Sequence, residues 1–266
     1  MRKLHLVLFL TALIIGQSCS KVPVTGRKQF RMLPQKLILG MSLTNYQDFL
    51  SSNTVVPATD ERTKLVRKVG SNLQTAVTNY LLKNGYSKRL KGFSWQYNLV
   101  QNSTVNAWCM PGGRIVVYSG LLPITETEAG LATVMSHEIA HAVARHGNER
   151  MSQQLALILG GVTLAVALND HPEETRNIFL AVYGVGGTLG ALAYSRKHEY
   201  EADKIGMVFM ALAGYDPSEA VKFWERMAAH SGPSIPQFLS THPSDENRVK
   251  AMKEFLPTAM QYYKKN

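Results

Sequence analysis

Hydrophobic residues recur every three or four positions along most of this chain, and this spacing predicts helices. Residues 35–50 and 60–83 each carry one apolar face. Further helices are predicted at residues 195–213 and 217–230, where glycine, aspartate and proline mark the ends. β-branched runs are short, so the pattern favours a mostly helical protein.

Two apolar stretches, residues 155–168 and 178–193, are each shorter than the ~20 residues that a membrane-spanning helix needs. Glycines in the second stretch weaken it further as an isolated helix. We therefore expect buried or interfacial helices. Insertion into a membrane through residues 155–193 is the alternative, and the solubility of a signal-free chain would test it.

Strand-like alternation of apolar and polar residues occupies the interval 93–100. Two further short strands are predicted at residues 105–110 and 114–118, joined by a turn at Pro111-Gly112-Gly113. The chain is therefore expected to have an α+β fold, mostly α-helical, with a small antiparallel sheet.

The first residues have the layout of an export signal. Arg2 and Lys3 precede an apolar run over residues 4–15, and small or polar residues lead to Cys19. This layout resembles a bacterial lipoprotein signal, so we expect residues 1–18 to be a signal peptide and Cys19 to carry lipid. An ordinary signal peptide beside a nearby cysteine is the alternative. The expected location is the periplasmic side of a bacterial envelope, with the lipid in the outer membrane.

The composition is that of a folded protein, with 266 residues of which 45% are hydrophobic. One domain over residues 19–266 is expected at this length. The net charge is +10, but the basic residues are scattered without interleaved aromatic residues, so nucleic acid is not predicted as a partner. Beside Cys19 there is one other cysteine, Cys109, so a lipidated chain would hold no internal disulfide.

The strongest chemical signal is His137-Glu138 followed by His141. Histidines four residues apart lie on one face of a helix, where both imidazoles can reach one zinc ion. Glu138 is rotated away from that face, within reach of a water molecule rather than of the metal, and is the candidate general base. A pair of histidines on an exposed helix face without metal is the alternative, and a third ligand weighs against it.

The helix that carries this motif has recognisable ends. Thr125 and Glu128 have the spacing of a capping box, and Gly147 is the predicted stop after residues 145–146. A metzincin would need a glycine three residues after His141 and a histidine six after it. Ala144 and Gly147 occupy those positions, which excludes that class.

A catalytic zinc site needs a third protein ligand and an open fourth position. Glu173 and Glu174 are one source, in a predicted loop. The other source is the later helix, where Glu199 and Asp203 are four residues apart and share a face while Glu201 points elsewhere. We predict that Glu199 binds the metal and that Asp203 braces a ligating histidine.

Several motifs in the same order resemble those of the zinc peptidase family of the CAAX prenyl proteases, HtpX and the OMA-type proteases. Small bacterial lipoprotein members such as LoiP and the protease domain of BepA resemble the chain most. The resemblance covers roughly residues 22–252. Its motifs are Pro23-Val24-Thr25-Gly26-Arg27, Asn106-Ala107-Trp108 with Pro111-Gly112-Gly113, His137 to His141 with Arg145-His146, Ser195-Arg196 leading to Glu199 and Asp203, and His242-Pro243 with Arg248.

The resemblance implies a zincin-like fold with zinc bound by His137, His141 and Glu199 and with Glu138 as catalytic base. It also implies that His242 lies near the active site, either stabilising the oxyanion or acting as a removable plug on the zinc. The chain departs from the prenyl proteases and HtpX in having no clear membrane spans, and from BepA in having no repeat domain after the protease part. Prenylated substrates are therefore not expected.

The predicted function is zinc-dependent endoproteolysis of misfolded or envelope proteins, with protein or peptide substrates and one Zn²⁺ per chain. The strand at Asn106, Ala107 and Trp108 is expected to pair with an extended substrate backbone, although it could simply complete the sheet. The rival function is a non-catalytic, zinc-containing periplasmic lipoprotein acting as chaperone or scaffold. Glu138 argues against it, because a purely structural site has no use for a base.

Overall fold

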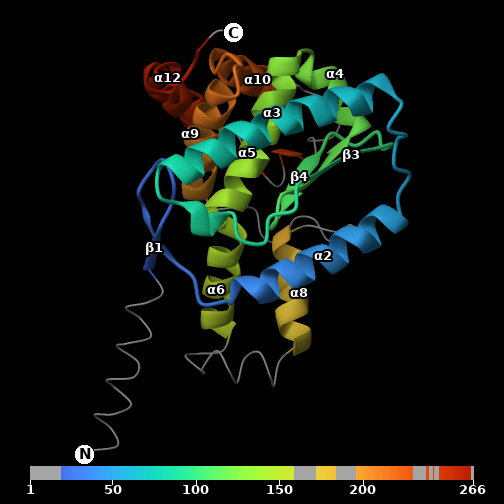
Figure 1. Ribbon diagram of the computed structural model, residues 1–266, viewed down its shortest axis with the longest axis vertical. Coiled ribbons are helices and arrows are strands. Elements are labelled where there is room, and N and C mark those ends of the chain that lie inside the picture. Colours follow the sequence, from blue (N-terminus) through green and yellow to red (C-terminus); the bar gives the residue numbers. More distant parts are fainter. Residues whose placement is uncertain are drawn as a thin grey trace, which may run out of the picture.

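The computed structural model describes residues 19–158, 172–183, 196–229, 238–239, 242 and 246–264 (Figure 1). The described helices are α2 (Gln35–Ser51), α3 (Glu61–Lys83), α4 (Leu122–Thr125), α5 (Glu128–Ala144), α6 (His146–Ile158), α8 (Pro172–Tyr183), α9 (Arg196–Leu212), α10 (Ser218–Ala229) and α12 (Glu246–Met260). The described strands are β1 (Cys19–Lys21), β2 (Lys28–Phe30), β3 (Gln96–Val100), β4 (Ala107–Met110) and β5 (Arg114–Tyr118). The predicted mostly helical α+β fold is confirmed.

Helix α5 runs through the middle of the molecule (Figure 1). It packs against α9, α3 and α10 and against strand β4, and its side chains are buried on every side from Gly130 to Ala144. A helix that is apolar all round belongs in a core, which explains why the zinc motif lies inside the protein rather than on its surface.

Helices α5 and α9 touch at backbone level beside the first motif histidine. A Cβ atom built on Gly206 of α9 would lie 3.1 Å from the backbone nitrogen of His137. The missing side chain therefore allows α9 to approach α5 closely, and its acidic residues reach the histidines.

The three-stranded sheet has the order β3-β5-β4. Strand β5 is antiparallel to β4 but parallel to β3, so the predicted antiparallel sheet is in fact mixed. The tight turn after Met110 pairs β4 with β5 as a hairpin, and that hairpin inserts β5 between β3 and β4. Strand β4 is left at the sheet edge, next to α5.

The C-terminus of α5 is capped by side chains from distant parts of the chain. Arg89 donates to the carbonyl oxygens of Val143 and Ala144, both at 3.1 Å, and Gln29 donates to that of Ala144 at 2.6 Å. A cation at the C-terminal end of a helix also interacts favourably with the helix dipole. With its carbonyl groups satisfied, α5 ends at Arg145 in a left-handed conformation, φ 60°.

These contacts correct the predicted N-cap and the predicted stop residue of the motif helix, although its end near Arg145 agrees with the prediction. The N-cap is Thr127, whose hydroxyl accepts from the backbone N–H of Gly130, and not Thr125, which ends the short α4. At the other end, the helix stops at Arg145, and Gly147 lies inside the next helix, α6. The end therefore depends on tertiary capping rather than on glycine.

Strands β1 and β2 form an antiparallel hairpin. A small second core of Leu33, Ile38, Met151, Leu155, Ile178 and Val182 joins the following helix α2 to α6 and α8. Within the described ranges, no helix combines the length and the apolar character that crossing a membrane requires. The predicted signal peptide, residues 1–18, and much of the interval 155–193 lie outside the described residues, and lipidation at Cys19 stays a prediction.

Candidate metal centre

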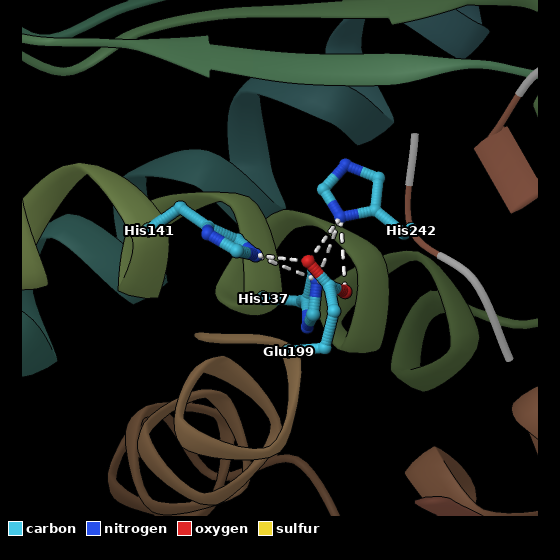
Figure 2. Close-up of side chains that lie close together, drawn as sticks. All are labelled: His137, His141, Glu199 and His242. Carbon is cyan, nitrogen blue, oxygen red and sulfur yellow. Dashed lines mark hydrogen bonds and ion pairs between the residues drawn. The ribbon is translucent and has the colours of Figure 1, made fainter. Parts of the chain in front are cut away.

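Four side chains from three parts of the chain converge at one buried point (Figure 2). Helix α5 contributes His137 and His141, helix α9 contributes Glu199, and His242 lies before α12. One donor atom from each lies within 4.8 Å of the other three. All four residues are buried, with at most 3% of their surface exposed.

The donor atoms around Nε2 of His137 lie at distances close to those in a tetrahedral metal site. Nε2 of His137 lies 3.1 Å from Nε2 of His141, 3.2 Å from Nδ1 of His242 and 3.3 Å from Oε2 of Glu199. Tetrahedral zinc with bonds of 2.0–2.1 Å holds its ligand atoms about 3.3 to 3.4 Å apart. Imidazole nitrogens and a carboxylate oxygen are also the donors that zinc accepts, so the residues fit this ion.

The protonation states of His141 and Glu199 suit metal binding. Burial lowers the pKa of His141 well below its usual value, which favours the neutral ring. Burial acts to raise the pKa of Glu199, but the neighbouring His242, Arg248 and His141 outweigh it and hold that pKa well below its usual value. Glu199 is therefore a carboxylate beside neutral His141, and both can act as ligands.

The predicted brace lies behind His137. Oδ1 of Asp203 is 3.0 Å from Nδ1 of His137, on the opposite side of the ring from the converging Nε2. Arg248 fixes this carboxylate with two hydrogen bonds and stacks 3.7 Å above the ring of Trp224. Asp203 thus occupies the position of a carboxylate that orients a metal ligand.

The predicted base lies at the edge of the cluster. Glu138 is buried, and its Oε1 lies 3.3 Å from Nε2 of His242. The backbone N–H of Cys109, in edge strand β4, donates to the same carboxyl group. Burial raises the pKa of Glu138 to about 7, although His242 opposes the shift. A carboxyl group with that pKa can exchange a proton at neutral pH.

The predicted substrate-binding residues lie beside this base, but their side chains point away from solvent. Ala107 belongs to the main core on the α5 side, whereas Trp108 packs edge-on against Phe49 of α2, at 5.0 Å, on the other face. The backbone carbonyl of Asn106 accepts from the N–H of Tyr118, and its side-chain Oδ1 accepts from the N–H of Ala107; this residue is also buried. These three side chains therefore present little surface that a substrate could contact.

The alternative third ligands lie elsewhere. Glu173 and Glu174 are exposed in the first turn of α8 rather than in a loop, and neither belongs to the converging group. Glu201 does point away from the cluster, as predicted, toward His146.

Sequence reasoning did not assign roles to Arg248 and His146, both fully buried beside the cluster. Each belongs to a motif of the resemblance. Their spacing carried no metal-ligand signal, however, because Arg248 contacts a carboxylate and His146 contacts a ligand rather than the metal position. The signal available in the sequence was an arginine or a histidine placed within a motif of the family resemblance.

Comparisons with known proteins identify the relatives of the chain. The model of Peptidase family M48 matches residues 69–256. The mitochondrial metalloendopeptidase OMA1 of Schizosaccharomyces pombe is 33% identical over 90% of the chain and 66% of the relative. The corresponding protein of Saccharomyces cerevisiae is 32% identical over 92% of the chain and 71% of the relative. A putative beta-barrel assembly-enhancing protease of Vibrio cholerae is 32% identical over 59% of the chain and 33% of the relative.

The family resemblance is thereby confirmed, but the predicted location is not. The two yeast relatives that match 90% and 92% of the chain are mitochondrial proteins, whereas the Vibrio relative matches 59%. These matches contradict the outer-membrane location inferred from the N-terminus. The reason is that an apolar segment after basic residues is a short, degenerate pattern that carries little information about compartment.

Proposed function

The chain belongs to peptidase family M48, and we propose that it is a zinc-dependent endopeptidase acting on proteins or peptides. The observation that carries this proposal is the convergence of His137, His141 and Glu199 on one point, with Glu138 beside it. A purely structural zinc site would gain nothing from a carboxyl group whose pKa is about 7.

Zinc bound by these residues would supply a Lewis acid and lower the pKa of a water ligand to about 7. The work of the chain is then proton transfer. The Glu138 carboxylate takes the proton of the attacking water, holds it at the oxygen that faces the cluster, and passes it to the leaving amine. The raised pKa of Glu138 favours both steps near neutrality.

The backbone edge of β4 is the proposed substrate site. Strand β4 has one hydrogen-bonded neighbour in the described sheet, and its Cys109 N–H donates to Glu138. An extended substrate added along this edge would run past the base and the metal ligands. Because the β4 side chains are buried, we expect backbone recognition and therefore broad sequence tolerance at this strand.

His242 is proposed to act as a plug in the closed form of the site. Its Nδ1 takes a fourth ligand position, 3.2 Å from each oxygen of Glu199, and its Nε2 faces Glu138. A catalytic zinc needs this fourth position for water. Activity would then require that the His242 ring withdraw, after which the ring could still contact an oxyanion.

The variant Glu138→Gln tests this function. It keeps the shape of the side chain but removes the base, so we expect one zinc per chain and at least a 100-fold loss of casein cleavage. The matched control is Glu225→Gln, a change at an exposed carboxylate paired with Lys253, which should cleave normally. If the wild-type chain bound zinc, but neither the wild type nor His242→Ala cleaved casein, the non-catalytic scaffold would be favoured instead.

A further inference from the structure

The two motif histidines are supported in different ways. His137 meets a carboxylate directly, since Oδ1 of Asp203 lies 3.0 Å from its Nδ1. His141 instead meets another histidine, since its Nδ1 lies 3.0 Å from Nδ1 of His146. Nε2 of His146 in turn lies 2.9 Å from Oε2 of Glu201. A neutral ring is thus inserted between a ligand and its carboxylate.

Metal binding fixes the direction of every hydrogen bond in this row. If Nε2 of His141 binds the metal, the proton of its neutral ring is on Nδ1, which therefore donates to Nδ1 of His146. His146 must then carry its own proton on Nε2 and donate it to Glu201. Both rings are buried, so the other tautomer of either ring would leave a ring nitrogen without its hydrogen bond and without water to replace it.

The carboxylate at the end of the row is held by the β1–β2 hairpin. Oε1 of Glu201 accepts from the hydroxyl of Thr25, and Oε2 accepts from Nε of Arg27 at 2.8 Å. Arg27 is anchored in turn by two hydrogen bonds to Glu149, at 2.8 and 2.7 Å. Thr25 and Arg27 are the polar residues of the motif Pro23-Val24-Thr25-Gly26-Arg27. Their contact with Glu201 therefore links this motif to the row of residues behind His141.

We propose that His146 and Glu201, held by Thr25 and Arg27 of the β1–β2 hairpin, are positioning residues that set the tautomer and orientation of the zinc ligand His141. The affinity of the centre for metal then depends on a hairpin more than 100 residues away in sequence. This inference rests on the proposed metal centre. The competing explanation is that the same bonds merely attach the hairpin to the helices, with no effect on the metal.

The structure offers a matched pair of variants to separate these explanations. Glu201 and Glu149 are both buried carboxylates, both pair with Arg27, and each accepts from a histidine. Glu201 accepts from His146, which bonds the ligand, whereas Glu149 accepts from His198. Glu201→Gln and Glu149→Gln should therefore both loosen the hairpin, but only the first changes the direct acceptor of His146 in the row behind His141.

The experiment measures zinc affinity of the full chain by competition with a chromophoric chelator, together with the visible spectrum of the Co²⁺-substituted protein. We expect Glu201→Gln to lower zinc affinity by about 10- to 100-fold and to shift the Co²⁺ bands. Thr25→Val, a mild change at an exposed residue, should lower the affinity less but in the same direction. Glu149→Gln acts on the row only indirectly, through Arg27, and should therefore lower the affinity much less than Glu201→Gln does.

A rescue pair tests the ligand end of the row. His146→Leu removes the acceptor for His141 and should weaken zinc binding, whereas the amide oxygen of His146→Gln should recover part of the affinity. Equal losses in the Glu201 and Glu149 variants, or no loss in Glu201→Gln and Thr25→Val, would overturn the proposal. If wild-type chain bound no zinc, the proposed function itself would have failed, which is a distinct result.

Discussion

Asp203 and His137 form a carboxylate–histidine pair across the interface of α9 and α5, with 3.0 Å between Oδ1 and Nδ1. The carboxylate is itself immobilised, because Arg248 binds both of its oxygens. The same arginine lies 3.2 Å from Oε2 of Glu199. One buried cation therefore holds a predicted ligand and the brace of another ligand in a single arrangement, which prepares the site before metal arrives.

Asp203→Asn should lower zinc affinity by about 10- to 100-fold while leaving the fold intact. The amide cannot reproduce the charge that keeps the proton on Nδ1 of His137, so Nε2 becomes a weaker ligand. Chelator competition measures the change. Asp48→Asn, in an exposed part of α2, is the control and should bind zinc as the wild type does. Unchanged affinity in Asp203→Asn would remove the brace from the mechanism.

Arg248→Met should destabilise the metal-free protein by about 3–5 kcal/mol, because it leaves the buried carboxylates of Asp203 and Glu199 without their cation. Urea unfolding of the chelator-treated chain measures this loss. Arg226→Met provides the comparison, since Arg226 is partly exposed and pairs with Glu219 near the surface. Its effect should stay within about 1 kcal/mol. A similar cost for both variants would mean that the buried charge cluster contributes little.

Helical periodicity and ligand spacing were enough to predict the helices that carry the motif. They also predicted that Glu199 and Asp203 lie on the same face of one helix. Both depend on local geometry, because residues four apart share a face on any helix. Zinc chemistry then demanded a third ligand, and the structure brings Glu199 to that point.

Features that depend on tertiary contacts could not be predicted in the same way. Alternation identifies a strand but not its neighbour, so the parallel pairing of β3 with β5 was missed. Thr125 and Thr127 offer similar capping chemistry, and the turn at Glu126, with φ 57°, decides between them. The contact of Arg27 with Glu201 joins residues 174 positions apart, which no local period encodes.

Acid should destabilise the metal-free protein partly through Glu149. Burial acts to raise the pKa of Glu149, but hydrogen bonds from Arg27, His198 and Gln29 outweigh it and hold the pKa well below its usual 4.5. A carboxyl group with a lowered folded-state pKa adds stability that is fully present above the unfolded value, and that stability is lost as pH falls through the folded value. The window therefore opens near pH 4.5 and extends downward.

Thermal unfolding between pH 6 and pH 3 measures this dependence. Glu149→Gln should be less stable than wild type at pH 6, and the difference should shrink toward pH 3, because the wild-type carboxylate loses its advantage there. Glu225→Gln, at an exposed position, should track the wild type across the whole range. A constant difference between Glu149→Gln and wild type would show that the effect is packing rather than charge.

His242→Ala should raise cleavage of an unfolded protein substrate, because it removes the proposed plug, the ring whose Nδ1 lies among the converging donor atoms. A plug that favours the closed site by about 1.4 kcal/mol gives roughly a tenfold rise. Zinc affinity should fall at the same time, since one donor is lost. If the ring instead stabilises the oxyanion, activity falls by about 100-fold or more. Steady-state cleavage of casein separates the two directions, and adding Glu138→Gln to His242→Ala should abolish the gain, because the same base serves the opened site.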